Sequence, residues 1–281
     1  IMLYGCEVWG PWYIFKTNRT DTEQLLKNEN FDFEKLHTKF CKQTLRVNKS
    51  TSNLASRVEM GRYPLVLSVI MSFIKYFFNL CEKPETSLAY KALKLQLQLT
   101  NSKYITAICK ILQFLNTEQI TNPNFKVISN LLENTYVDIF YQSIENISKL
   151  EIFKTIKLNY RCAKYLNVVN NVHRCNLTKL RLSSHKLPIE TGRYFNIIRE
   201  ERICNVCPSN QVGNEYHLLF DCQNEHLVNC RNAYMDLLYS KCIQLKSLSN
   251  SLCKFFIHSW PCKFFLLILG SAIFFTKSST P

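Results

Sequence analysis

The sequence predicts a mainly α-helical protein, and its composition, its turn residues and its hydrophobic periodicity each support this. The chain has 281 residues, of which 47% are hydrophobic and 20% charged, so it can bury a core and is neither disordered nor fibrous. It contains only 6 Gly and 8 Pro, too few for the many tight turns of a β-sandwich or barrel. Long stretches rich in Leu, Lys, Ile and Asn leave room for helices instead.

Charge and cysteine content narrow the class of protein. The formal net charge is +14, which implies attraction to polyanions, either nucleic acid or an anionic membrane surface. Thirteen cysteines are scattered without regular spacing, and the opening residues lack the basic and apolar regions of a signal peptide. We therefore expect an intracellular protein of the nucleus or cytoplasm. The first residue is Ile1, which runs directly into YGCEVWG, and we expect the chain to be a fragment.

Residues 32–47 give the first strong helical pattern. Apolar or small positions recur at steps of three and four and are expected to face the core: Phe33, Leu36, Phe40, Thr44 and Val47. Five cations recur at the same steps on the opposite face: Lys35, Lys39, Lys42, Arg46 and Lys49. Like charges at this spacing repel one another, so we expect this column to face nucleic-acid phosphates; a solvated helix face is the alternative.

Further helices are predicted over 53–60, 64–80, 87–99, 105–115 and 127–147. The segment 64–80 approaches the length of a membrane span. Its polar residues share one narrow stripe, which is typical of a nearly buried bundle helix: Ser68, Ser72, Lys75 and Asn79. The apolar run 264–275 is shorter than a bilayer requires, so no membrane insertion is expected.

The positive charge is concentrated in residues 151–203, which hold eleven Lys or Arg against four Asp or Glu. Cations alternate there with aromatic residues, a composition that supplies both phosphate contacts and stacking surfaces for unpaired bases. The candidate nucleic-acid-binding residues in and beside this segment are Lys179, Arg181, His185, Lys186, Arg193 and Arg202.

The most specific motif follows at residues 204–222. Cys204, Cys207, His217 and Cys222 form the pattern C-x2-C-x9-H-x4-C, whose three thiols and one imidazole suit a tetrahedral zinc ion. His226 and Cys230 form a second His-Cys pair that could supply the last two ligands instead. A site closed by four protein ligands leaves no position for a reactive water, so the expected role is structural, to hold together a small module.

Several of these segments together resemble one protein family. They are YGCEVWG at 4–10, EKLHTKFCKQTLRVNKSTSN at 34–53, GRYPL at 61–65, LTKLRLSSHKLPIETGRY at 177–194, and the Cys-Cys-His-Cys motif. In this order they resemble the region downstream of the polymerase core in non-LTR (LINE-type) retrotransposon reverse transcriptases, over residues 1–235. The resemblance implies a thumb-like end at 1–60, a helical connector at 61–150, a basic nucleic-acid-binding segment at 151–203, a zinc knuckle at 204–222 and C-terminal helices at 223–281.

The resemblance also implies a role in holding RNA template or target DNA during target-primed reverse transcription, beside an upstream polymerase domain of the same polypeptide. The polymerase needs paired metal-binding carboxylates, and this sequence contains no Asp-Asp pair. Residues 223–281 hold only Glu225 and Asp236 as acids, so no nuclease is expected.

Two other functions stay open from the sequence. The first is a zinc-stapled helical module whose basic surface binds an acidic protein. The second is an autonomous enzyme that uses Cys or His, which the sequence disfavours because no Cys-His pair stands beside a recognisable acid or oxyanion element.

Overall fold

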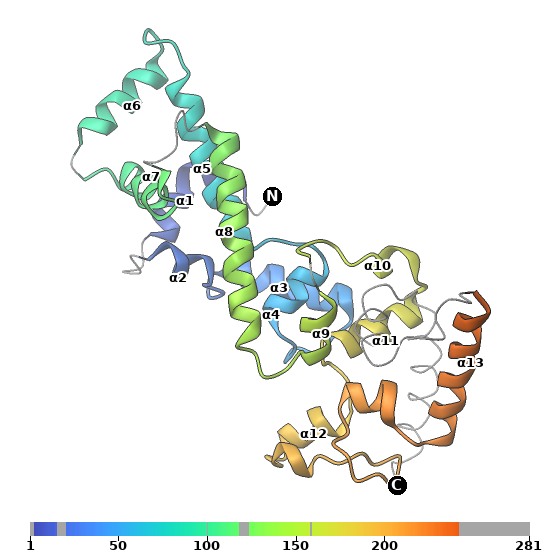
Figure 1. Cartoon of the computed structure of the whole chain (residues 1–281). Helices are drawn as coiled ribbons and strands as arrows, with labels where there is room; N and C mark the ends of the chain where they lie inside the picture. Colours follow the sequence, from blue (N-terminus) through green and yellow to red (C-terminus); the bar gives the residue numbers. More distant parts are fainter. Residues whose placement is uncertain (1–2, 16–20, 100, 118–123, 158, 242–281) are drawn as a thin grey trace. The chain divides into compact units, whose positions relative to one another are not determined.

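A computed structural model describes residues 3–15, 21–99, 101–117, 124–157 and 159–241 of the chain. These residues are mainly helical, which confirms the predicted fold class (Figure 1). Within the described ranges, β-structure is limited to two isolated bridges, Met60 with Cys162 and Ile203 with Val212. The predicted helices of 223–281 are described only as α13 (Glu225–Lys241), and the apolar run 264–275 lies outside the described residues.

The chain divides into two compact units, each built from two segments of sequence. Unit 1 comprises residues 1–40 and 62–146, and unit 2 comprises residues 41–61 and 147–281. This division differs from the sequence-based boundaries at residues 60 and 150, because residues 41–61 belong with the C-terminal segment. The helix α3 (Asp32–Leu45) contributes residues to both units.

Unit 1 is organised around one buried helix, α5 (Leu65–Cys81), as the sequence predicts. Its buried side chains include Val69 and Phe73. The helix α1 (Cys6–Ile14) packs closely against them at Gly10, which has no Cβ; a Cβ added there would lie only 2.5 Å from Val69 Cγ1. No helix in the described part of the chain combines the length and apolarity needed to cross a membrane. The other helices of this unit are α1 (Cys6–Ile14), α2 (Thr22–Leu26), α6 (Leu88–Gln98), α7 (Lys103–Phe114) and α8 (Phe125–Glu145) (Figure 1).

The buried face of α3 is not the face that its apolar residues predict. Leu36 and Phe40 are 52% and 51% exposed, whereas Glu34 and His37 are buried. The Glu34 carboxylate accepts a hydrogen bond from the backbone N–H of Val66, at 2.7 Å, in the first turn of α5. That N–H has no partner within its own helix, so a carboxylate that caps it can draw a polar face inward. The predicted inward stripe is therefore wrong.

The helix α3 is also shorter than predicted. It ends at Leu45, and Arg46 adopts a left-handed backbone conformation with φ 54°. Arg46 and Lys49 therefore lie on the loop after the helix, and only Lys35, Lys39 and Lys42 remain on it. The single column of five cations on one helix face does not exist.

Unit 2 has a core that joins its helices to the segment of the Cys-Cys-His-Cys motif. Its buried residues include Leu177 and Leu180 from α11 and Cys204 and Cys222 from the motif. The helices of this unit are α4 (Asn53–Glu59), α9 (Glu151–Ile156), α10 (Tyr165–Val168), α11 (Asn171–Arg181), α12 (Pro188–Tyr194), η2 (Arg199–Glu201), η3 (His217–Asp221) and α13. The motif is thus part of a larger core and not the small separate module that the sequence suggests.

A buried ion cluster ties residues 41–61 to the C-terminal segment of unit 2. Glu59, at the end of α4, accepts hydrogen bonds from Arg181 Nε at 2.5 Å and Nη2 at 3.2 Å, and Lys157 Nζ lies 3.8 Å away. The guanidinium of Arg181 also lies over the ring of Tyr165. Burial alone would raise the pKa of Glu59, but Arg181 and Lys157 hold it below its ordinary value.

Candidate metal centre

The two halves of the motif come from different local structures. Cys204 and Cys207 lie in a hairpin-like loop, which is closed by hydrogen bonds from Cys204 N–H to the Gln211 carbonyl and from Gly213 N–H to the Arg202 carbonyl, both at 2.8 Å. His217 begins η3, a π-helical turn, and Cys222 follows its end. The Cys222 N–H donates to the His217 carbonyl at 2.8 Å, five residues earlier, which is the π-helical pattern. This wider turn brings the two side chains of H-x4-C to one side.

The four side chains meet at one point. Their ligand atoms all lie within 4.8 Å of one another, so the cluster could hold a metal ion. Cys204 Sγ is 4.0 Å from Cys222 Sγ, and Cys207 Sγ is 3.3 Å from His217 Nε2. A tetrahedral ion with sulfur and nitrogen ligands would separate these atoms by roughly 3.5–3.8 Å, so small shifts would suffice.

Burial and hydrogen bonding set the charge states of the thiols in opposite directions. Burial raises the pKa of the Cys222 thiol to about 12 and also raises that of Cys204. Burial would raise the pKa of Cys207 as well, but hydrogen bonds from Ser209 and from the Gln223 backbone lower it to about 6. Two thiols buried as neutral groups must lose protons before they bind a metal, so metal binding would release protons.

The orientation of His217 is fixed by residues that the sequence analysis missed. Its Nδ1 lies 2.8 Å from the amide oxygen of Gln211, an acceptor, which makes Nδ1 the donor and leaves Nε2 free to face the thiols. The backbone N–H of His217 donates to the Asn214 side chain at 2.7 Å. Asn214 directly precedes the helical residues 215–221, and an Asn at this position commonly caps a helix by accepting from the N–H three residues further on, so this signal could have identified it. No sequence signal identifies Gln211.

The alternative pair is not part of the cluster. Among the described residues, the group that could hold a metal contains His217 and Cys222 and does not contain His226 or Cys230. His226 is exposed at the start of α13, and Cys230 packs against the core of unit 2. The structure therefore favours the nearer pair.

Four of the expected nucleic-acid contacts are engaged in internal interactions instead. Arg181 pairs with buried Glu59, and His185 Nε2 lies 2.8 Å from Glu215 Oε1. Arg193 bonds Glu190 at 3.1 Å, and Arg202 donates to the backbone carbonyls of Ile189 and Ile197. These four side chains hold unit 2 together, and their expected role as nucleic-acid contacts stays a prediction.

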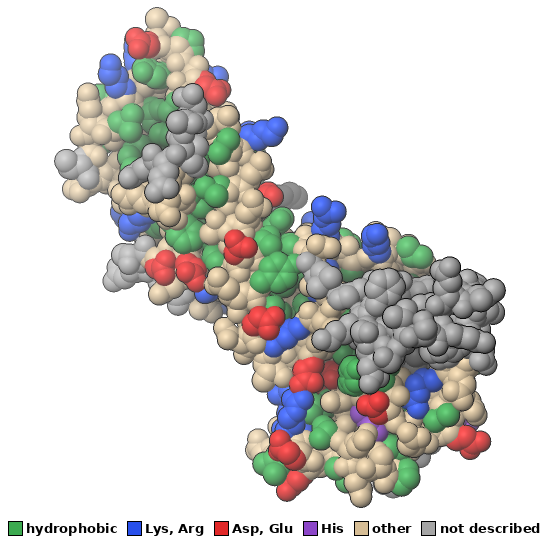
Figure 2. Space-filling view, viewed as in Figure 1, with side chains coloured by type: hydrophobic (Ala, Val, Ile, Leu, Met, Phe, Trp, Pro, Cys, Tyr) green, Lys and Arg blue, Asp and Glu red, His purple; other side chains and the backbone are tan. Residues whose placement is uncertain are grey.

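The remaining candidate cations are accessible to differing degrees. Lys35, Lys39, Arg46, Lys49 and Lys186 are exposed, and Lys42 and Lys179 are half-buried. The Lys42 ammonium donates to the Lys49 carbonyl at 2.6 Å, which fixes the loop after α3. On the face seen in Figure 2, cations are interspersed with acidic side chains and do not form one continuous patch.

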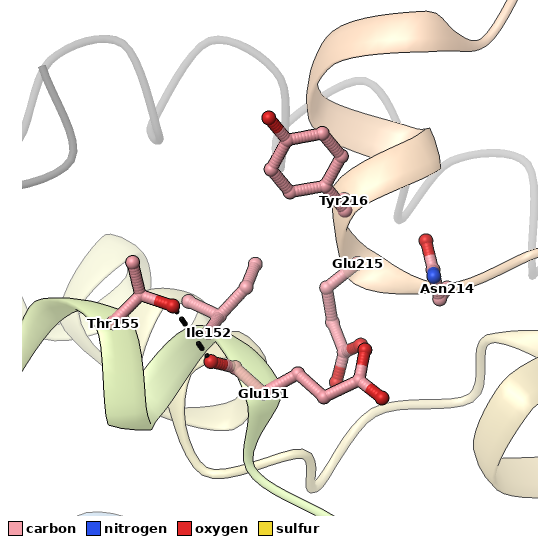
Figure 3. Close-up of a pocket in the computed structure, with 6 residues that line it drawn as sticks. All are labelled: Glu151, Ile152, Thr155, Asn214, Glu215 and Tyr216. Atoms are coloured by element: carbon pink, nitrogen blue, oxygen red, sulfur yellow. Dashed lines mark hydrogen bonds between the residues drawn. The ribbon is translucent and has the colours of Figure 1, made fainter. Parts of the chain in front are cut away.

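A cleft of about 210 Å³ lies beside the start of η3, between it and α9 (Figure 3). Glu151 and Glu215 both line it, but Glu151 is paired with Arg199 and Glu215 with His185 and Ser183. Both carboxylates are thus already held by internal partners, and the described lining of the cleft offers no unpaired acid or base.

Comparisons with protein-family models, with curated proteins and with solved structures found no match to this chain.

Proposed function

We propose that this chain is a zinc-stabilised nucleic-acid-binding fragment that positions RNA template or target DNA beside a polymerase domain of the same polypeptide. This is the role that its resemblance to non-LTR retrotransposon reverse transcriptases implies. The observation that carries the proposal is the convergence of Cys204, Cys207, His217 and Cys222, whose ligand atoms lie within 4.8 Å of one another.

The donor set favours zinc over other metal ions. Three thiolates and one imidazole suit a soft or borderline ion in tetrahedral geometry, and hard ions such as Mg²⁺ and Ca²⁺ prefer oxygen ligands. Cys204, His217 and Cys222 are buried, and four protein ligands complete the coordination. The ion would therefore be structural. Because Cys204 and Cys222 also belong to the core of unit 2, it would stabilise the whole unit.

Charge supports the nucleic-acid part of the proposal. The chain carries a net charge of +14, half of which lies in residues 151–203. Although several arginines there are used internally, Lys186 in that segment and Arg46 and Lys49 in the loop after α3 are exposed. Exposed cations release counterions when they bind phosphates, so affinity should fall steeply as salt increases.

The metal site is tested by elemental analysis of the purified full chain and of Cys207→Ser and Cys230→Ser variants. We expect one zinc per chain in the parent and in Cys230→Ser, and loss of zinc in Cys207→Ser. Absence of zinc in the parent after refolding with zinc would overturn the site. Loss of zinc in Cys230→Ser as well as in Cys207→Ser would assign the last two ligands to His226 and Cys230.

Nucleic-acid binding is tested by titrating the zinc-loaded chain with labelled RNA and DNA over a range of salt concentrations. We expect log Kd to rise linearly with log salt concentration, with a slope near 0.7 to 0.9 for each phosphate contacted. Binding of an acidic protein without any affinity for nucleic acid would replace this proposal with the interaction-module alternative.

A further inference from the structure

Two segments of unit 2 that are far apart in the sequence meet at one surface. The backbone N–H of Asn48 donates to Ser184 Oγ at 2.9 Å, and Ser50 Oγ lies 3.3 Å from Tyr194 Oη. The loop after α3 is thus joined to the segment 184–194 at two points. On the loop, Arg46 lies two residues before Asn48 and Lys49 lies between Asn48 and Ser50, and Lys186 lies two residues beyond Ser184. All three cations are exposed.

None of these three cations has a carboxylate partner among the residues that the structure describes. The described ion pairs of unit 2 use other cations, such as Lys149 and Arg193 with Glu190 and Arg199 with Glu151. Exposed cations without local acids are suited to a polyanion.

The same surface presents two aromatic rings that the core does not use. Tyr194 ends α12 and is 64% exposed, and Phe195 follows it and is 76% exposed. A ligand that covered the exposed ring of Phe195 would remove apolar surface from water, which is favourable. Its neighbours along the chain include Ile198, which is 57% exposed, so the apolar surface continues past the helix.

The end of α12 fixes the backbone that carries these rings. Asn196 has a left-handed φ of 54°, its N–H donates to the Arg193 carbonyl at 3.3 Å, and the N–H of Ile197 donates to the Gly192 carbonyl at 2.9 Å. This pair of bonds is the Schellman arrangement that terminates helices. Arg202 clamps the same turn, since it donates to the Ile197 and Ile189 carbonyls. A backbone that is fixed in advance loses little conformational entropy when its side chains bind a ligand.

We propose that Tyr194 and Phe195 stack unpaired bases of a single-stranded RNA or DNA while Arg46, Lys49 and Lys186 contact its phosphates. This inference rests on the proposed nucleic-acid-binding function and adds the strand state and the residues. Bases in a duplex are already stacked on their neighbours, so exposed rings beside cations select unpaired bases. A protein partner is less well suited, because three uncompensated cations border the rings.

The test compares single-stranded and duplex ligands on the zinc-loaded full chain. Fluorescence anisotropy would measure the Kd for labelled oligo(dT), oligo(U) and a DNA duplex of the same length. The variants are Tyr194→Ala/Phe195→Ala and Tyr194→Leu/Phe195→Leu, which keeps apolar bulk without aromatic faces. Tyr4→Ala is the matched control, because Tyr4 is a 90% exposed aromatic residue of unit 1.

We expect both double variants to weaken oligo(dT) and oligo(U) binding about tenfold for each ring removed, with duplex binding and the Tyr4→Ala variant unchanged. Removal of cations by Lys49→Gln/Lys186→Gln should instead reduce the salt dependence. Zinc content equal to that of the parent shows that each variant is folded.

The possible failures can be told apart. If the parent binds nucleic acid and the double variants bind single strands as tightly as the parent, this inference is overturned and the proposed function stands. If variants weaken single-strand and duplex binding equally, the rings do not select unpaired bases, and the inference is again overturned. If the parent binds neither ligand, the proposed function fails and the inference fails with it.

Discussion

Replacement of Glu59 by Gln should be among the most destabilising single changes in unit 2. The substitution keeps the size of the side chain and removes the charge that neutralises two buried cations, Arg181 and Lys157. The Glu59 side chain is fully buried, and the Arg181 and Lys157 side chains are only 13% and 6% exposed. Water therefore cannot replace the lost carboxylate.

The magnitude follows from which cation can adapt. Burial lowers the pKa of Lys157 despite the nearby Glu59, so Lys157 can release its proton in the variant. Arg181 cannot, because a guanidinium stays protonated in proteins. One uncompensated buried cation remains, and the expected loss is about 3–5 kcal/mol in the free energy of unfolding.

Urea unfolding of the zinc-loaded chain measures this loss, with far-UV circular dichroism and zinc release followed together, since zinc release reports on unit 2. Glu151→Gln is the matched control, because its ion pair with Arg199 is about half exposed and should contribute less than about 1 kcal/mol. The double variant Glu59→Gln/Arg181→Met should recover most of the stability, as the orphaned cation is gone. A Glu59→Gln variant no less stable than Glu151→Gln would refute the reasoning.

Three other changes have definite expected outcomes. Gln211→Leu should weaken zinc affinity about 10- to 100-fold without abolishing binding, measured by competition with a chelating indicator, because the hydrogen bond that orients the metal-site histidine is lost. Gly61→Ala should lower the free energy of unfolding by more than about 1 kcal/mol, because Gly61 has φ +63° and an added Cβ would lie 2.3 Å from Cys162 N. Gly5→Ala is the control: Gly5 has a similar φ, but an added Cβ would meet no atom closer than 3.8 Å, so the loss of unfolding free energy in the same urea titration should be smaller. The pKa of Glu59 is held below its ordinary value of 4.5, so the stability that its carboxylate contributes is complete above pH 4.5 and is lost as the pH falls further. At pH values below 4.5 the urea concentration at the unfolding midpoint should therefore decrease in the parent, and it should decrease less steeply in Glu59→Gln.

The sequence predicted well those features that depend on local spacing. The helical class, the buried helix α5 and the four-residue metal cluster all follow from residue types recurring at fixed short intervals. The spacings C-x2-C and H-x4-C each place two ligands within one local turn. The contact between these two turns was therefore the only long-range feature that the prediction of the metal cluster needed.

The sequence failed where a distant partner decides what a side chain does. The inward face of α3 includes Glu34, which caps another helix, and hydrophobic periodicity contains no record of that contact. Arg181 and His185 look like surface residues in the sequence because their acidic partners, Glu59 and Glu215, lie 122 and 30 residues away in the chain. The Lys and Arg residues of a basic segment thus include some that face solvent and some that pair with buried carboxylates, and only the fold distinguishes the two groups.

The discontinuity of unit 2 has a consequence for how the chain acquires its structure during synthesis. Residues 41–61 emerge early, yet Glu59 finds its partner Arg181 only 122 residues later, after the whole second segment of unit 1 has been made. A contact between residues so far apart in the sequence requires a long loop to close, which costs conformational entropy, so such contacts form slowly. Unit 1 can complete its core as soon as residue 146 has left the ribosome, whereas unit 2 must wait for the residues that follow. We therefore expect unit 1 to fold first and the uptake of metal to be among the last steps.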